Sequence, residues 1–280
     1  MLKRYRVLVV VGIVGAILAV RLLSRRWLFP ANELMAPAFA PDAASQTTLR
    51  NPTPSGVPQR LRRGTFAARD GTIVRTIELE APSGGRTIVY FHNNRETIEH
   101  ELDFARSLSA RGYGVVLVEY RGYGNSRGAE PSEDGLYLDA EAALDMLGAR
   151  GILPERIVLW GTSLGTGVAA EMARRGRGSK LILVTPYTSI PDLVTNVVPG
   201  MPARILLADH FDTLSKSSEI RVPTTIVHGD ADEVVPFWMG ERIAGAIAGA
   251  RLLRVRGGHH GDLFAREGDR LLTELVGSGT

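Results

Sequence analysis

The sequence predicts an α/β domain with a mostly parallel central sheet that is covered by helices on both faces. Six short apolar runs recur between residues 88 and 255, and several of the segments between them carry apolar residues at helical spacing. Such alternation of strand and helix is typical of parallel sheets, which are buried on both faces. A chain of 280 residues with 44% hydrophobic and 22% charged content is long enough for one such domain and an appendage.

Residues 1–29 are expected to form a single-pass, uncleaved membrane anchor. Val7–Val20 is a run of fourteen residues without a polar side chain, and basic residues flank it equally, which leaves its orientation open. A helix of this length covers ~21 Å, so a span across a ~30 Å hydrocarbon core must include Leu22 and Leu23 while Arg21 reaches the headgroups. A signal peptide is the alternative, although the nearest cleavage-like pattern, Ala38–Ala40, lies beyond three arginines.

Residues 30–60 are predicted to be a proline-rich tether, and residues 61–280 the folded domain. The tether contains six of the fifteen prolines and no apolar periodicity. The net charge of +3 combines +6 in the first thirty residues with −3 in residues 31–280. A nucleic-acid partner is therefore not expected, because DNA and RNA binders concentrate basic residues on the folded domain. The chain has no cysteine, which excludes disulfides, thiolate metal sites and a cysteine nucleophile.

The order of elements is predicted from residue 63 onward. Residues 63–79 alternate apolar and polar side chains around Asp70-Gly71, which indicates a hairpin. Apolar stripes predict helices at 98–109, 140–147, 239–247 and 263–276, and a further helix directly after Ser163. The predicted strands are Ile88–Phe91, Val115–Val118, Ile157–Leu159, Leu181–Val184, Thr224–Val227 and Leu252–Val255.

Ser163 is the leading candidate for a catalytic nucleophile. It stands in a Gly-x-Ser-x-Gly string between an apolar strand and a run of small residues, so it is expected on a sharp strand-to-helix turn that exposes its hydroxyl. Ser126 stands in a second string of this type, but the residues that follow it form a loop, and a loop-capping role is expected there. For Ser163 the alternative is a helix N-cap.

An acid and a histidine follow Ser163 in the chain order of a Ser-Asp-His triad, each just after a predicted strand. The segment after Val227 offers three acids, of which Asp230 fits a turn former, Glu233 a solvated face, and Asp232 precedes an apolar pair. The segment after Val255 offers His259 and His260, and either could be the base.

Backbone N–H groups for an oxyanion are expected at Leu164, directly after the nucleophile, and in the loop His92-Asn93-Asn94-Arg95. His92 is then expected to hold this loop rather than to act as a base. A metal site of His92, His228 and His259 is not expected, because no pair has the spacing of metal ligands on a helix face or strand.

These residues together resemble the α/β-hydrolase superfamily, and within it the membrane-anchored BEM46-like branch that includes ABHD13- and ABHD17-type proteins. The resemblance runs from about Arg63 to the C-terminus. It is carried by the runs Glu119–Ser126, Pro131–Leu144, Gly161–Ala169, Thr185–Ser189, His228–Pro236 and His260–Asp262.

The resemblance implies Ser163 as nucleophile, Asp232 as the acid and His260 as the base. It also implies an α/β-hydrolase fold with a short cap, since residues 191–214 are few where larger relatives insert a lid. Two departures are visible: Asn93 replaces the glycine of the family's His-Gly-Asn loop, which concerns the N–H of Asn94, and Glu119 replaces an aspartate.

The expected function is a serine hydrolase that cleaves esters or thioesters of a small or lipid-like acyl substrate through an acyl-enzyme. A peptidase or amidase on the same triad is the alternative, and a catalytically silent scaffold is a third. No cofactor is expected. The sequence leaves the acyl group, the leaving group and the oligomeric state open.

Overall fold

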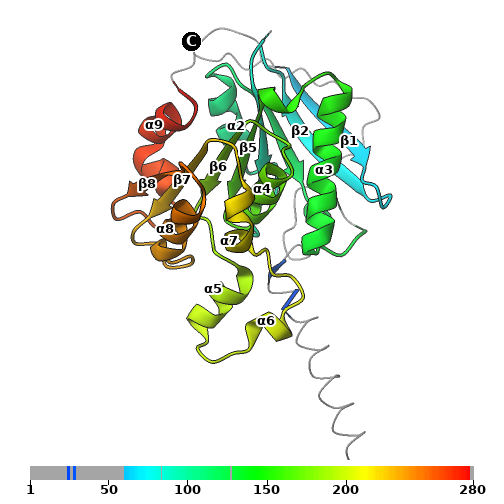
Figure 1. The fold of residues 1–280 in the computed structure, drawn as a ribbon. Helices are drawn as coiled ribbons and strands as arrows, with labels where there is room; N and C mark the ends of the chain where they lie inside the picture. The colour runs from blue at the N-terminus through cyan, green and yellow to red at the C-terminus, as the bar shows by residue number, and fades with distance from the viewer. Residues whose placement is uncertain (1–23, 26–27, 30–59, 83, 127, 278–280) are drawn as a thin grey trace, which may run out of the picture.

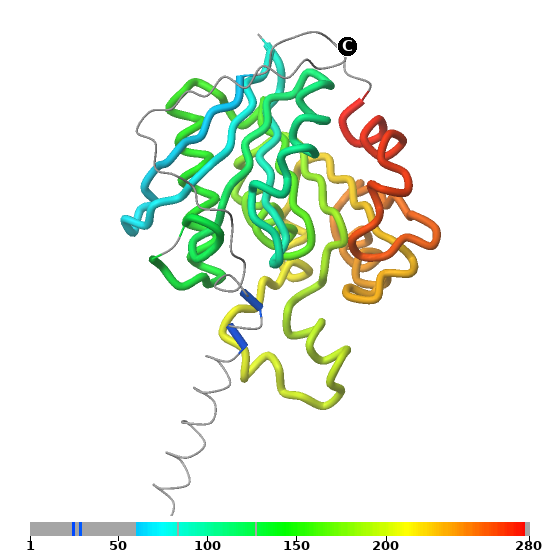
Figure 2. The backbone as a smooth tube through the Cα atoms, turned by 180° about the vertical axis from the view of Figure 1, so that it is seen from behind, coloured from blue at the N-terminus to red at the C-terminus, as the bar shows by residue number. Residues whose placement is uncertain are grey.

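The computed structural model describes residues 24–25, 28–29, 60–82, 84–126 and 128–277. They contain one eight-stranded sheet with the strand order β1-β2-β4-β3-β5-β6-β7-β8. The antiparallel pairs are β1 with β2 and β2 with β4, and all other neighbours are parallel. The predicted hairpin and the mostly parallel α/β sheet are thus confirmed, with the hairpin at one edge and the C-terminal segment at the other (Figures 1 and 2).

The predicted strands and helices occur in the predicted order, but α3 begins at Glu133, before its apolar stripe at 140–147, and α5, α6 and α7 were not predicted. The strands are β1 Leu61–Ala67, β2 Ile73–Leu79, β3 Thr87–Phe91, β4 Gly114–Glu119, β5 Ile157–Thr162, β6 Lys180–Val184, β7 Thr224–Gly229 and β8 Arg251–Val255. The helices are α2 Leu102–Ser109, α3 Glu133–Ala149, α4 Leu164–Arg174, α5 Ile190–Val197, α6 Ala203–Leu206, α7 Thr213–Lys216, α8 Phe237–Ala246 and α9 Leu263–Val276. Two 3₁₀ turns complete them, Pro154–Arg156 and Ser217–Glu219.

The first helix begins later than its apolar stripe predicts. Ile98 is buried but lies in a turn before α2, where its N–H donates to Glu119 Oε1 over 3.1 Å. The carboxylate of Glu119 takes the place of a helical carbonyl as the acceptor for the Ile98 N–H. Ile98 is therefore buried with the rest of the apolar stripe, although the helix starts only at Leu102.

Two apolar clusters cover the two faces of the sheet. On one face α2 and α9 pack through residues such as Leu108 and Leu271 against alternate strand residues, including Trp160. On the other face α3, α4 and α8 pack against the intervening positions, such as Leu159. Because β3 and β5 to β8 are parallel, their carboxyl ends meet at one edge of the sheet, where the loops that carry the candidate residues emerge.

The segment predicted as a short cap follows β6 at this edge. It consists of α5, α6 and the chain between them, and it projects from the body of the domain in both views (Figures 1 and 2).

The last described residues of the predicted anchor segment pack on this domain. Leu28 and Phe29 are only 7% and 5% exposed and belong to the core cluster beneath α3 and α4. Phe29 contacts Phe211 edge to face, with ring centroids 6.3 Å apart. The predicted span Val7–Val20 and nearly all of the predicted tether lie outside the described residues. Within the described residues, no helix has the length and apolar character needed to cross a membrane.

Candidate active site

Ser163 lies on the sharp turn between β5 and α4, as the sequence predicts. Its backbone angles are φ 50° and ψ −115°, a conformation that costs free energy for any residue with a Cβ and is retained where the surroundings enforce it. The enforcing contacts are hydrogen bonds from Ser163 N to Val184 O, at 2.9 Å, and from Thr166 N to Ser163 O, at 2.9 Å. The Ser163 side chain makes no capping hydrogen bond, so its hydroxyl is not used as a helix N-cap.

Two glycines make this turn possible. A Cβ on Gly161 would overlap the carbonyl of Gly165, and a Cβ on Gly165 would overlap the carbonyl of Phe91 at the end of β3. The string Gly-x-Ser-x-Gly is therefore a packing requirement, because α4 starts in direct contact with both β5 and β3.

His260 and Asp232 converge on Ser163 from the loops that follow β8 and β7. The Nε2 atom of His260 lies 3.0 Å from Ser163 Oγ, and its Nδ1 atom lies 2.8 Å from Asp232 Oδ2. The distances allow a continuous hydrogen-bonded chain of serine, imidazole and carboxylate, in which Nδ1 carries a proton and Nε2 accepts the serine proton. The three residues are separated by up to 97 positions in the sequence.

The carboxylate of Asp232 is fully buried and held at both oxygens. Its Oδ1 accepts the N–H groups of Val234 and Val235 over 2.9 and 2.8 Å. Burial alone would raise the pKa of Asp232, but the hydrogen bonds from His228 and His260 outweigh it and hold the pKa well below its ordinary range. The carboxylate is therefore ionised at neutral pH.

His228 contacts the site, although the sequence pattern suggested no role for it beyond the unexpected metal site. It is fully buried, its Nε2 lies 2.9 Å from Val235 O, and the same atom lies 3.5 Å from Asp232 Oδ2. It thus ties the Asp232 loop to β7. The sign of this contact in the sequence is that His228 precedes Asp232 by four positions. In the described part of the chain no three His, Asp or Glu residues form a group that could hold a metal ion.

The rival candidates lie elsewhere or have other partners. His259 is half exposed and pairs with Glu233, with 3.0 Å between Nδ1 and Oε2. Asp230 accepts Gly257 N over 2.6 Å and Arg254 Nε over 2.8 Å, so it braces the loop after β8 as a turn residue would. Ser126 is buried in its loop, where its N–H donates to Tyr123 O over 2.8 Å.

The loop after β4 is built around the side chain of Glu119, the last residue of β4. This side chain is 2% exposed and accepts the N–H groups of Ile98 and Asn125. Burial raises its pKa to about 7, with the hydrogen bonds acting in the opposite direction. A Cβ on Gly124 would overlap this carboxyl group, so Gly124 leaves room for it. The contacts are structural, as expected from its position away from Ser163.

The loop after β3, where an oxyanion donor is expected, is held in place by His92, as the sequence predicts. His92 is fully buried against Tyr120 and Tyr123, and burial lowers its pKa to about 4, so it is neutral and holds the loop through Nδ1 and Asn93 O, 2.7 Å apart. Asn93 lines the cavity beside Ser163, whereas the side chain of Asn94 turns away and donates to Leu28 O over 3.4 Å. Leu164 is the first residue of α4, where backbone N–H groups lack helical partners.

The side chain of Asn93 fixes the loop at the position where the family has glycine. Its Oδ1 accepts Arg95 N over 2.8 Å, and its Nδ2 donates to Glu96 Oε2. The loop is thus closed into an Asx turn that is fixed to the wall of the cavity.

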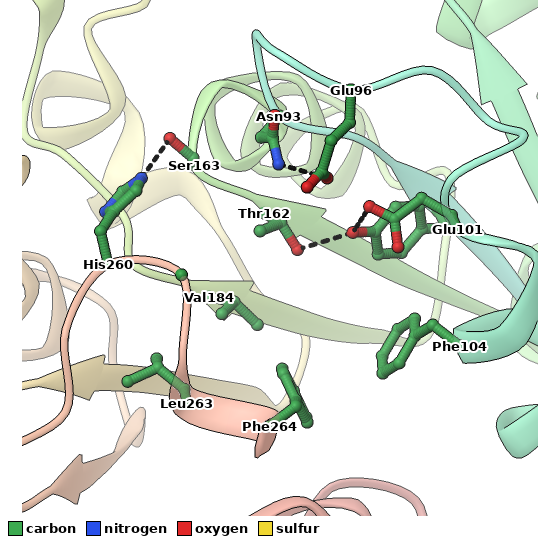
Figure 3. Close-up of a pocket in the computed structure, with 12 residues that line it drawn as sticks. Asn93, Glu96, Glu101, Phe104, Thr162, Ser163, Val184, His260, Leu263 and Phe264 are labelled. Atoms are coloured by element: carbon green, nitrogen blue, oxygen red, sulfur yellow. Dashed lines mark hydrogen bonds between the residues drawn. The ribbon is translucent and has the colours of Figure 1, made fainter. Parts of the chain in front are cut away.

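A cavity of about 220 Å³ opens beside Ser163 and His260 (Figure 3). One wall is polar and the other is apolar. The polar residues are Tyr90, Asn93, Glu96, Glu101 and Thr162, and the apolar residues are Phe104, Val184, Leu263 and Phe264. A group attached to a reacting carbonyl at Ser163 could occupy this space.

Glu101 is the most perturbed acid of the cavity. Burial, followed by the hydrogen bond and the charge of Glu96, raises its pKa to about 8. Tyr90 donates its hydroxyl to Glu101 over 2.9 Å and lies 3.2 Å from Thr162 Oγ1. A hydrogen-bonded row therefore runs along the polar wall from Thr162, next to the nucleophile, to the loop after β3.

Comparison with known proteins decides the family. The family model of serine aminopeptidases, S33, matches residues 85–218. The bem46 protein of Schizosaccharomyces pombe is 32% identical over 233 residues, which cover 79% of this chain and 76% of the relative. This chain belongs to the α/β-hydrolase superfamily and to its BEM46-like branch. It is an enzyme of the hydrolase class.

Other relatives of this BEM46-like hydrolase extend the comparison. An uncharacterised protein of Mycobacterium tuberculosis is 31% identical over 278 residues, covering 98% of this chain and 95% of its own. The lysophosphatidylserine lipase ABHD12 of Danio rerio is 35% identical over 176 residues, covering 56% of this chain and 46% of its own. Among solved structures, an esterase of Exiguobacterium antarcticum shares the fold at a TM-score of 0.62 and 22% identity, covering 76% of this chain and 97% of that one.

Proposed function

We propose that this hydrolase cleaves ester or thioester bonds through an acyl-enzyme on Ser163. The observation that carries the proposal is the row Ser163 Oγ, His260 and Asp232, with separations of 3.0 and 2.8 Å. Geometry of this kind lets the imidazole remove the serine proton as the oxygen attacks the carbonyl carbon, which turns a weak nucleophile into an effective one.

In the first half-reaction the Ser163 oxygen forms a bond to the carbonyl carbon and His260 Nε2 takes the proton. His260 then returns this proton to the leaving alkoxide or thiolate as its bond to carbon breaks. Water repeats the sequence on the acyl-enzyme and releases the acid. Asp232 stays ionised throughout, keeps the proton on Nδ1 and stabilises the imidazolium.

The N–H groups of Leu164 and Asn94 are the proposed donors to the oxyanion. Leu164 follows the nucleophile at the start of α4, where the helix dipole also favours negative charge. Asn94 lies inside the Asx turn between Asn93 and Arg95, and Glu96 fixes the Asn93 side chain.

The proposed substrate is a small or lipid-like acyl ester. The apolar wall of the cavity suits an acyl or alkyl chain, and the volume of about 220 Å³ accommodates a group of modest size. The printed name of the ABHD12 relative, a lysophosphatidylserine lipase, favours this class. The match to the serine aminopeptidase model favours amide cleavage as the second candidate. We further propose that Val7–Val20 anchors the enzyme in a membrane, close to such substrates.

The experiment is to treat the full chain and its Ser163→Ala variant with a fluorophosphonate probe. We expect labelling of the parent protein and none of the variant, while the matched Ser126→Ala variant is labelled like the parent. Labelling that survives Ser163→Ala and disappears in Ser126→Ala would refute the assignment. A panel of p-nitrophenyl esters of increasing chain length, beside peptide anilides, then separates ester from amide cleavage.

A further inference from the structure

The cap exposes several large apolar side chains. Val197, Val198 and Ile205 are 71%, 51% and 63% exposed, although most large hydrophobic side chains of the described residues are buried. From Leu193 to Ala208 the only charged side chain is that of Arg204. A concentration of exposed apolar residues on a projecting element is typical of a surface that contacts a partner.

A hollow with a mixed lining continues this surface toward α8, and its polar residues are Asp192, Thr195, Asn196, Arg204 and Arg242. Met201 and Ile205 from the cap and Trp238 from α8 line it together, and Trp238 is 37% exposed. Arg242 lies beside this tryptophan, with its guanidinium carbon 5.9 Å from the ring centroid. Tryptophan with a neighbouring arginine is a frequent combination at the boundary between lipid chains and headgroups.

The N-terminal segment is attached to the same cap. Arg25 forms a salt bridge with Asp209, with Nε and Oδ2 2.8 Å apart, directly after the cap helices. Ser24 and Leu28 line a small hollow together with Ile190 and Val194 of α5. Ser24, the first described residue, therefore lies against the cap.

The apolar run in the sequence ends close to this point. Val20 lies at most about 14 Å from Ser24, because an extended chain advances no more than about 3.6 Å per residue. Val197 follows Val194 by three residues, which is about 4.5 Å along the axis of α5. A bilayer that contains Val7–Val20 must therefore have its surface within reach of the exposed cap residues.

We propose that the cap is a lipid-docking surface: Val197, Val198, Ile205 and Trp238 enter the headgroup and upper acyl region of the bilayer that holds the N-terminal run. The inference rests on the proposed membrane anchoring and deepens it. The domain then has a fixed orientation, with the carboxyl edge of the sheet, and hence Ser163, on the side that faces the lipid.

The absence of cysteine makes the orientation measurable in the full chain, since one introduced thiol is the only one. Val197→Cys and Ile205→Cys carry an environment-sensitive fluorophore on the cap. Leu153→Cys is the matched control. Leu153 is 58% exposed, but it precedes β5 and so lies near the amino ends of the parallel strands, away from the cap. Val14→Cys reports the N-terminal run itself. Each protein is reconstituted in vesicles of phosphatidylcholine and phosphatidylglycerol in equal parts, with and without doxyl-labelled lipid.

We expect blue-shifted emission and strong quenching by doxyl lipid at positions 14, 197 and 205, and neither effect at position 153. Quenching at position 14 without quenching at 197 and 205 would overturn the cap inference and leave the anchor intact. No quenching at position 14 would overturn the anchoring on which it rests. A blue shift at 197 and 205 without quenching by doxyl lipid would instead indicate contact between two copies of the chain, and would also overturn the inference.

An activity measurement tests the consequence for substrate access. The double variant Val197→Asp, Ile205→Asp should hydrolyse an ester embedded in vesicles roughly tenfold more slowly than the parent, because carboxylates are costly to bring into the lipid boundary. Its rate on the soluble ester p-nitrophenyl acetate should equal that of the parent. Leu153→Asp should alter neither rate. Equal rates of the double variant and parent on embedded ester would contradict lipid docking.

Discussion

Asp232 is bound to His260 through one carboxylate oxygen and to its own loop through the other. Oδ2 lies 2.8 Å from His260 Nδ1, while Oδ1 accepts two backbone N–H groups of residues 234 and 235. The carboxylate is thus fixed before any substrate arrives, and its position determines the orientation of the imidazole that faces Ser163.

Asp232→Asn should reduce kcat by about 10⁴-fold, because an amide at this position favours the imidazole tautomer that cannot accept the serine proton. Steady-state hydrolysis of p-nitrophenyl acetate measures the loss. Asp230→Asn is the control, since Asp230 binds only the loop after β8 and Arg254, and it should retain activity within a few-fold. A mild effect of Asp232→Asn would remove this residue from the proposed triad.

His260→Ala should reduce turnover by at least about 10³-fold, because general-base assistance contributes about 10² to 10⁴-fold and nucleophile activation depends on it. His259→Ala should change turnover little, since His259 faces Glu233 and solvent. The two neighbours form a matched pair of identical substitutions. The same ester assay with both variants decides between them, and equal losses would contradict the assignment of His260 alone.

Gly165→Ala should destabilise the protein by more than about 3 kcal/mol or prevent folding, because the added Cβ overlaps the Phe91 carbonyl at the end of β3. Gly148→Ala, inside α3, meets no atom within 4 Å and should stabilise by about 0.5 to 1 kcal/mol through helix propensity. Urea unfolding followed by circular dichroism measures both. A tolerated Gly165→Ala would show that α4 can shift away from β3.

Glu101 should contribute stability that is lost as pH rises from about 4.5 to about 8. The pKa of Glu101 is raised from 4.5 to about 8 by burial and by Glu96, so in this window the native state holds a proton that the unfolded chain has released. The unfolded state binds fewer protons, and this contribution to the free energy of unfolding decreases with pH.

Glu101→Gln keeps the acceptor for Tyr90 and removes this titration, so it should flatten the slope across that window. Urea midpoints at pH 5, 6, 7 and 8, chosen to span the window, measure it. Glu130→Gln, at an exposed position after β4, serves as the control and should leave the slope as in the parent. An unchanged slope in Glu101→Gln would mean that this carboxyl group is already ionised in the native state.

The sequence by itself determined the class of the fold, because burial on both faces imposes apolar strands and amphipathic helices that are visible in one dimension. It also favoured Ser163 over Ser126, since the small residues of α4 are what close contact with β3 and β5 requires. The later start of α2 could not be predicted, because its cause is the side chain of Glu119 on a different strand.

The residue pattern alone left two adjacent histidines open as the base and only the family resemblance implied His260, whereas the tertiary structure brings His260 Nε2 to 3.0 Å from Ser163 Oγ. His259 and His260 have the same chemistry and nearly the same position in the sequence, and their directions depend on the loop that joins β8 to α9. Contacts between distant segments also decide that Asn93 lines the cavity, and that Leu28 and Phe29 are buried against a core formed by residues far along the chain. The period of apolar residues shows which face of a helix or strand is buried. The direction of a loop side chain, in contrast, is set by contacts between segments that are distant in sequence.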